Sequence, residues 1–143
     1  MTAGRHLGAA ALLAASLLPW LSGTGNAAQT LDIELTKLMD MDGKCAASLR
    51  LTNHMTETLD IVRFDLYVFD KAGVSARHLI LDTGPMHTDN TTVASLPLVD
   101  GPCSNIGRLV IKDVPECKTA AGADVDCVGA LNLTSRTAAP LTK

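Results

Sequence analysis

Apolar and polar residues alternate with a period of two along most of the chain after residue 30. In the stretch LDIELTKL, residues 31–38, Leu31, Ile33 and Leu35 fall on one side and the polar residues between them on the other. This period is typical of β-strands with one buried and one solvated face. Clusters of Gly, Pro, Asn and Asp interrupt it and predict turns. The pattern predicts seven strands and a loose tail, with the strands at residues 31–38, 45–53, 59–70, 74–81, 92–98, 106–114 and 128–135 and the tail at 136–143.

Short strands separated by turns, without a convincing helical period, predict an all-β fold. We expect an immunoglobulin-like antiparallel β-sandwich of two sheets. The stretch 59–70 holds both phenylalanines and the only tyrosine of the chain. We therefore expect this strand to be central and its rings to form the bulk of the core, with Phe64 deepest. The predicted core residues of this strand are Phe64, Leu66, Val68 and Phe69, while Tyr67 sends its hydroxyl to the rim.

The N-terminus has the three regions of a secretory signal peptide. Arg5 precedes the apolar run LGAAALLAASLLPWL, and the small residues of SGTGNAA follow. A membrane anchor is the alternative, but the run is shorter than the roughly 20 apolar residues of a span. We expect a signal peptide at residues 1–28, cut at Ala27 or Ala28, and a single domain at 29–143. The protein would then be periplasmic or secreted, with no membrane span after cleavage.

The charge of the exported part argues against a nucleic-acid partner. The chain has 12 Lys and Arg, one of them Arg5 in the signal segment, against 15 Asp and Glu. No basic stripe or cluster is present. An envelope protein, of unknown identity, is the expected partner.

Four cysteines lie in the exported part, and an even number in an oxidising compartment predicts two disulfides. Three pairings are possible. We favour Cys117–Cys127, which closes the short polar loop CKTAAGADVDC, and Cys45–Cys103. Metal ligation is the alternative, but it is poorly supported because no two cysteines have a C-x-x-C spacing.

The central part of the sequence resembles the FxLYD-type immunoglobulin-like domains. In those domains a strand ends in Asn, a polar turn follows, and Leu precedes an F-x-L-x-x-F/Y-D-x-x-G strand and turn. The matching residues here are Asn53, Leu59, Phe64, Leu66, Phe69, Asp70 and Gly73. The stretches LDIELTKL and CSNIGRLVIKDV and the C-terminal tail also resemble small uncharacterised exported proteins of alphaproteobacteria. The resemblance implies an immunoglobulin-like sandwich that serves as an adhesion, interaction or scaffold module.

No sequence signature of catalysis is present. The chain lacks G-x-S-x-G, H-E-x-x-H, S-x-x-K and a glycine-rich phosphate loop. The histidines after the signal segment are His54, His78 and His87, and no local pattern places one of them in a triad. We expect a protein that is not an enzyme. In the stretch DMDG, Asp40 and Asp42 resemble part of a calcium loop, but a turn with Gly43 at its tip is the preferred interpretation.

One set of residues suggests a metal function. Methionines after the initiator lie near turns or strand ends, and two of them are adjacent to histidines. Thioether and imidazole ligands select copper(I). The candidate ligands are Met39, Met41, His54, Met55, Met86 and His87.

Two functional hypotheses follow. The first is a non-catalytic protein-interaction or scaffold module of the cell envelope, without a cofactor, which acts through a sheet edge or face. The alternative is a periplasmic copper(I) carrier that uses the Met and His residues named above.

Overall fold

The computed structural model describes residue 1 and residues 28–143 of the chain. The predicted signal peptide and its cleavage site fall almost entirely on residues 2–27, outside the described residues. The strands are β1 (Leu31–Met41), β2 (Lys44–Asn53), β3 (Leu59–Asp70), β4 (Ser75–Asp82), β5 (Thr91–Asp100), β6 (Ile106–Thr119), β7 (Leu131–Ser135) and β8 (Leu141–Thr142). A short 3-10 helix, η1 (Cys103–Asn105), precedes β6, and a one-turn α-helix, α1 (Cys127–Ala130), precedes β7.

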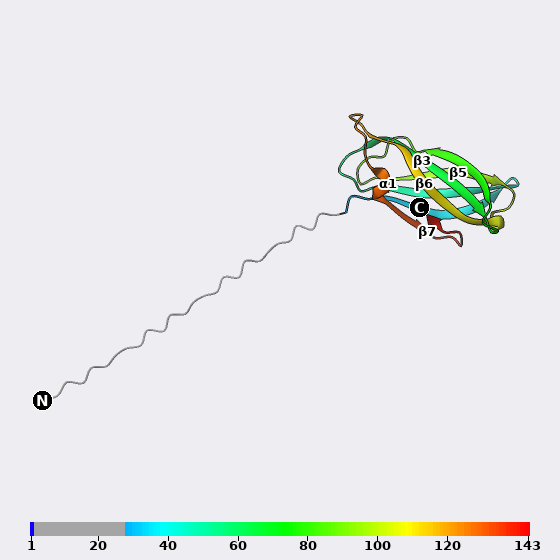
Figure 1. The fold of residues 1–143 in the computed structure, drawn as a ribbon, viewed down its shortest axis with the longest axis horizontal. Helices are drawn as coiled ribbons and strands as arrows, with labels where there is room; N and C mark the ends of the chain where they lie inside the picture. The colour runs from blue at the N-terminus through cyan, green and yellow to red at the C-terminus, as the bar shows by residue number, and fades with distance from the viewer. Residues whose placement is uncertain (2–27) are drawn as a thin grey trace.

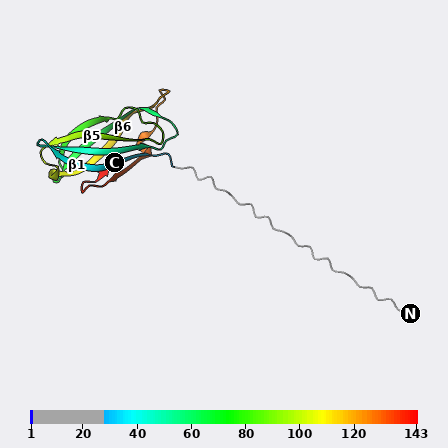
Figure 2. The same cartoon turned by 180° about the vertical axis from the view of Figure 1, so that it is seen from behind.

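The strands form two four-stranded sheets that pack face to face as an elongated sandwich, seen from opposite sides in Figure 1 and Figure 2. One sheet, sheet A, has the order β5-β2-β1-β7, and the other, sheet B, has the order β4-β3-β6-β8. The all-β sandwich predicted from the sequence is confirmed, and β3 is an interior strand as expected. Two edge pairings are parallel, β1 with β7 and β6 with β8, while the other pairings are antiparallel.

The C-terminal tail is ordered by its contacts, so the prediction of a loose tail is wrong. The Ser135 hydroxyl donates to the carbonyl of Ala139 at 2.7 Å, and the Leu109 amide donates to the carbonyl of Pro140 at 2.9 Å. Leu141 is buried and pairs with Leu109 in β6. The tail therefore carries the chain from sheet A to sheet B and covers that flank of the sandwich.

The core lies between the sheets and takes alternate residues from each long strand. Phe64 is fully buried, as are Leu66 and Val68 on the same side of β3. Phe69 is five residues from Phe64, so the alternation places it on the opposite, outer face, where it is only partly buried. Its assignment to the core is therefore wrong. On that face the Arg108 guanidinium lies over the Phe69 ring at 4.7 Å from its centroid.

Both predicted disulfides are present. Cys45 in β2 is bonded to Cys103 in η1, and Cys117 in β6 is bonded to Cys127 in α1. The first disulfide fixes η1 against sheet A, and the second ties α1 to sheet B. Within the described residues, no helix is long and apolar enough to cross a membrane.

Three turns meet at one end of the sandwich. The Gly101 amide donates to the carbonyl of Gly43 at 2.8 Å, which joins the β5–β6 connection to the β1–β2 turn. The Lys71 amide donates to the carbonyl of Asn105 at 3.1 Å, which joins the β3–β4 turn to η1. We call this end the hairpin end, and both surface hollows considered below lie beside it.

Candidate functional site: a methionine-lined hollow

The six predicted copper ligands do not form one site. Met55 and Met86 are buried in the core, with 7% and 1% of their surface exposed. The sequence placed them in loops, but Asn53 draws both loops inward: its side-chain NH2 donates to the carbonyl of Met86, and its oxygen accepts from the amide of Met55. These two methionines therefore fill the end of the core away from the hairpin end.

His54 and His87 are exposed near these methionines. The His54 ring nitrogens lie 3.6 Å from a carboxylate oxygen of Asp32 and 3.5 Å from one of Asp89. Met39 is near the other end of β1. Leu31 pairs with Asn53, the neighbour of His54, and Met39 lies eight positions further along the strand than Leu31, about 26 Å away. The predicted six-residue copper set is thus split between opposite ends of the sandwich.

A β-bulge decides where the other two methionines point. Leu31, Ile33 and Leu35 face the core, and without interruption Met39 and Met41 would continue their face. The register of β1 against β2 shifts between Leu35 and Lys37. After this shift Leu38 packs against the core and Met39 and Met41 lie on the outer face of sheet A.

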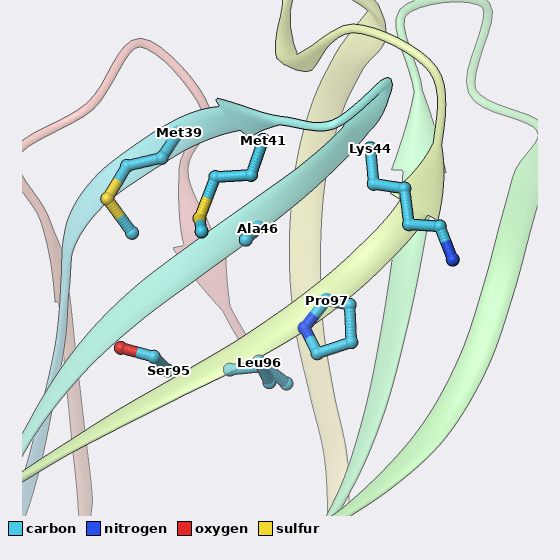
Figure 3. Close-up of a pocket in the computed structure, with 7 residues that line it drawn as sticks. All are labelled: Met39, Met41, Lys44, Ala46, Ser95, Leu96 and Pro97. Atoms are coloured by element: carbon cyan, nitrogen blue, oxygen red, sulfur yellow. The ribbon is translucent and has the colours of Figure 1, made fainter.

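These methionines line a surface hollow of about 490 Å³ near the hairpin end. Figure 3 shows both thioether side chains on the same side of β2 as Ala46, with Ser95, Leu96 and Pro97 on the neighbouring strand. Small residues opposite them leave the space, because Met39 pairs with Ala46, and Ala46 pairs with Pro97. The lining residues are Met39, Met41, Lys44, Ala46, Ser95, Leu96 and Pro97. We call this site the methionine hollow.

The methionine hollow lies on an outer face that is mostly polar. Further along the same face, the Glu34 carboxylate pairs with Arg50 at 2.7 Å and with Arg136 at 2.6 Å. The Thr52 and Thr91 hydroxyls lie 3.0 Å apart. At the hollow the only charged lining residue is Lys44, whose ammonium lies 3.6 Å from a carboxylate oxygen of Asp100. The hollow can accept an apolar side chain, and methionine adapts its shape to different ones.

The β1–β2 turn has the conformation expected of a turn rather than of a calcium loop. Asp42 and Gly43 have positive φ angles of 49° and 76°. The Asp40 carboxylate accepts a hydrogen bond from the Cys103 amide at 2.6 Å, so it anchors η1. Among the residues that the structure describes, no group of three or more His, Cys, Asp or Glu side chains is placed to hold a metal ion.

The outer face of sheet B carries a second set of paired polar residues. His78 hydrogen-bonds to Asp65 and stacks on Tyr67, with ring centroids 4.4 Å apart. The Arg63 guanidinium bonds to Asp82 at 3.0 Å. The Gly84 amide and then Arg63 hold the pKa of the Asp82 carboxyl below its ordinary value, since both stabilise the charged form. The rings of this face are partly covered by basic side chains, Arg108 over Phe69 and Lys112 over Tyr67.

The sequence predicted Met39 and Met41 as functional residues, but for a different chemistry. It did not single out their partners Ala46, Ser95 and Pro97. The sequence carries only a weak signal for these three residues: each is a small residue at an outward-facing strand position, where larger polar side chains are usual. Only the pairing of β2 with β5 shows that they are neighbours.

Comparisons with known proteins support the fold. The chain matches no protein-family model and no curated protein sequence. The solved structure of IrmA from Escherichia coli is similar, with a TM-score of 0.54 and 17% identical residues, over 73% of this chain and 91% of that chain. At this identity the likeness concerns the sandwich fold alone.

Proposed function

We propose that this protein is an exported, non-catalytic protein-interaction module of the cell envelope, and that it holds its partner at the methionine hollow. Two disulfides are typical of proteins that fold in an oxidising, extracytoplasmic compartment. The N-terminal sequence pattern agrees with export. Sandwich domains commonly present binding sites on a face or an edge of a sheet.

The observation that carries this proposal is the exposed apolar lining of the hollow. Met41 has 54% of its surface exposed, on a face where paired charges and hydroxyls predominate and where Val93 is also exposed. Apolar concave sites with a polar rim are typical of binding sites. The expected occupant is an apolar side chain of a partner polypeptide, with Lys44 at the rim available to a polar group beside it.

Selection of displayed peptides tests this function. The purified exported protein is used to select binders from a random peptide library, and the affinities of selected peptides are measured by calorimetry. We expect the selected peptides to share an apolar anchor residue. The Met39→Gln/Met41→Gln variant, which keeps side-chain length but adds polar groups, should weaken binding at least about tenfold.

Val93→Gln is the matched control, because Val93 is another exposed apolar residue of the same sheet, 65% exposed, and does not line the hollow. It should leave the affinities unchanged. If the methionine variant binds the peptides as well as the unmodified protein does, the hollow is not the binding site. A library that returns no apolar consensus would argue against a peptide-binding function.

The copper(I) alternative is reduced to the pair Met39 and Met41, because Met55 and Met86 at the opposite end are buried in the core. Two thioethers without an imidazole are a sparse copper site. A copper(I) titration under reducing conditions distinguishes the two functions. Sub-micromolar binding that the Met39→Gln/Met41→Gln variant loses would replace the protein-interaction proposal with the carrier.

A further inference from the structure

A second hollow, of about 390 Å³, lies on the open flank of the sandwich between the edge strands β4 and β5. It is separate from the methionine hollow and shares no lining residue with it. Its volume is within the range of small-molecule sites. Its lining residues are Asp70, Ala76, Arg77, Val99, Asp100, Asn105 and Ile106. We call it the flank hollow.

The walls of the flank hollow are held in place by bonds on two sides. The Asp70 carboxylate accepts from the Val74 amide at 2.8 Å and fixes the β3–β4 turn. The Cys45–Cys103 disulfide holds η1, which ends at Asn105. The bond from the Lys71 amide to the Asn105 carbonyl joins these two walls. The hollow is thus formed before any ligand arrives, which reduces the free-energy cost of binding.

The charged groups of the flank hollow are incompletely paired. Three arginines elsewhere in the sandwich, Arg50, Arg63 and Arg136, each form an ion pair. Arg77, by contrast, forms no ion pair and no side-chain hydrogen bond with any residue that the structure describes. Asp70 lines the same hollow and has no cationic partner among the described residues.

A guanidinium and a carboxylate therefore lie in one hollow without neutralising each other. Asp100 adds a second carboxylate, which is already paired with Lys44 at 3.6 Å. A simple anion would meet repulsion from the two aspartates, and a simple cation would meet repulsion from Arg77. A ligand that carries both charges satisfies both groups, because guanidinium binds carboxylate and carboxylate binds ammonium.

From this arrangement we infer that the flank hollow binds a small zwitterion, an α-amino acid with an apolar side chain. The ligand carboxylate accepts hydrogen bonds from Arg77, and the ligand ammonium donates to Asp70. Ala76, Val99 and Ile106 form the apolar part of the lining and contact the ligand side chain. Because Arg77 is exposed, water competes for it, and the affinity is expected to be in the millimolar range.

A titration of the full exported protein with L-valine, monitored by two-dimensional amide NMR, tests this inference. We expect saturable shifts at the amides of Arg77, Asn105 and the β3–β4 turn. N-acetyl-L-valine, which lacks the ammonium, and L-valinamide, which lacks the carboxylate, are matched probes. Each should bind at least about tenfold more weakly than valine. Equal binding of either derivative, or no saturable shift with millimolar valine, would overturn the proposal.

Two variants place the site. Arg77→Gln removes the guanidinium, and Asp70→Asn removes the carboxylate charge while keeping the oxygen that accepts from the Val74 amide. Each should reduce valine affinity at least about tenfold. Lys71→Gln is the control, because it removes a neighbouring positive charge that does not line this hollow. If Arg77→Gln binds valine normally, or if Lys71→Gln weakens binding as much, the assignment is wrong. The peptide experiment on the methionine hollow is unaffected by either result.

Discussion

The substitution Asn53→Ala tests whether one buried polar side chain holds the far end of the sandwich together. Asn53 is fully buried. Its NH2 group donates to the carbonyls of Glu57 at 3.0 Å and Met86 at 2.9 Å, and its oxygen accepts from the Met55 amide at 2.8 Å. These bonds connect the β2–β3 loop to the loop before β5, and they position the two buried methionines.

The expected loss follows from what each partner keeps. The Met86 carbonyl still accepts from the Leu59 amide at 3.0 Å, and the Glu57 carbonyl, in an exposed residue, can bind water. The loss at each is therefore about 0.5–1 kcal/mol. The Met55 amide belongs to a buried residue and has no replacement acceptor, which costs about 1–3 kcal/mol. We expect the free energy of unfolding to fall by about 2–5 kcal/mol, a large share of the roughly 5–15 kcal/mol of a typical domain.

Urea denaturation followed by far-ultraviolet circular dichroism, with disulfides intact, measures this loss. Thr52→Ala is the matched control, because it removes a neighbouring but exposed hydrogen bond to Thr91. It should lower the free energy of unfolding by less than about 1 kcal/mol. A loss of under about 1 kcal/mol for Asn53→Ala would show that the loops are held by their apolar contacts and that the hydrogen bonds add little.

Three further predictions concern the core, the disulfides and pH. Phe64→Ala should lower the free energy of unfolding by about 3–5 kcal/mol, because Phe64 is fully buried. Phe69→Ala should lower it by less than about 2 kcal/mol, because Phe69 is partly exposed. Equal losses in paired denaturation curves would contradict this expectation. Replacing Cys45 and Cys103, which are 58 residues apart, by alanine should lower the free energy of unfolding by up to about 4 kcal/mol. Replacing Cys117 and Cys127, which are 10 residues apart, should lower it by up to about 3 kcal/mol. The reverse order would show that loop closure in the unfolded chain is not the main effect of the disulfides. An NMR titration should give Asp82 a pKa below the ordinary value, and Arg63→Gln should raise it. The stability that Asp82 adds is present above the unfolded pKa of about 3.9 and is lost as the pH falls through the folded pKa. Asp82→Asn should therefore reduce the dependence of the free energy of unfolding on pH in that range.

Predictions from local pattern were accurate where one strand decided the outcome. The alternation in residues 59–70 predicted Phe64, Leu66 and Val68 as core residues, and all three are buried. The strand bounds there match the structure at both ends. The spacing of the cysteines was also informative, because a ten-residue separation leaves little freedom for Cys117 and Cys127.

Errors arose where a residue's surroundings come from other strands. Phe69 was expected in the core, but it lies on the outer face of β3 and is only partly buried. Met55 and Met86 were expected near turns or strand ends rather than in the core, and Asn53 folds both segments over the core. The C-terminal tail shows no strong strand pattern, and it is ordered by bonds to Leu109 and within its own turn.

The sequence by itself determined the all-β class and the central strand, because period-two alternation and short loops are properties of neighbouring residues. It favoured the cysteine pairing that the structure has, among three that were possible. Only the tertiary structure decided the two hollows. The bulge after Leu35 turns Met39 and Met41 outward, and its position depends on the register of β1 against β2. The flank hollow joins Asp70, Arg77 and Asn105 from segments that meet only when both sheets are assembled. Register and sheet packing are set by the fit of distant segments, so no local pattern contains them.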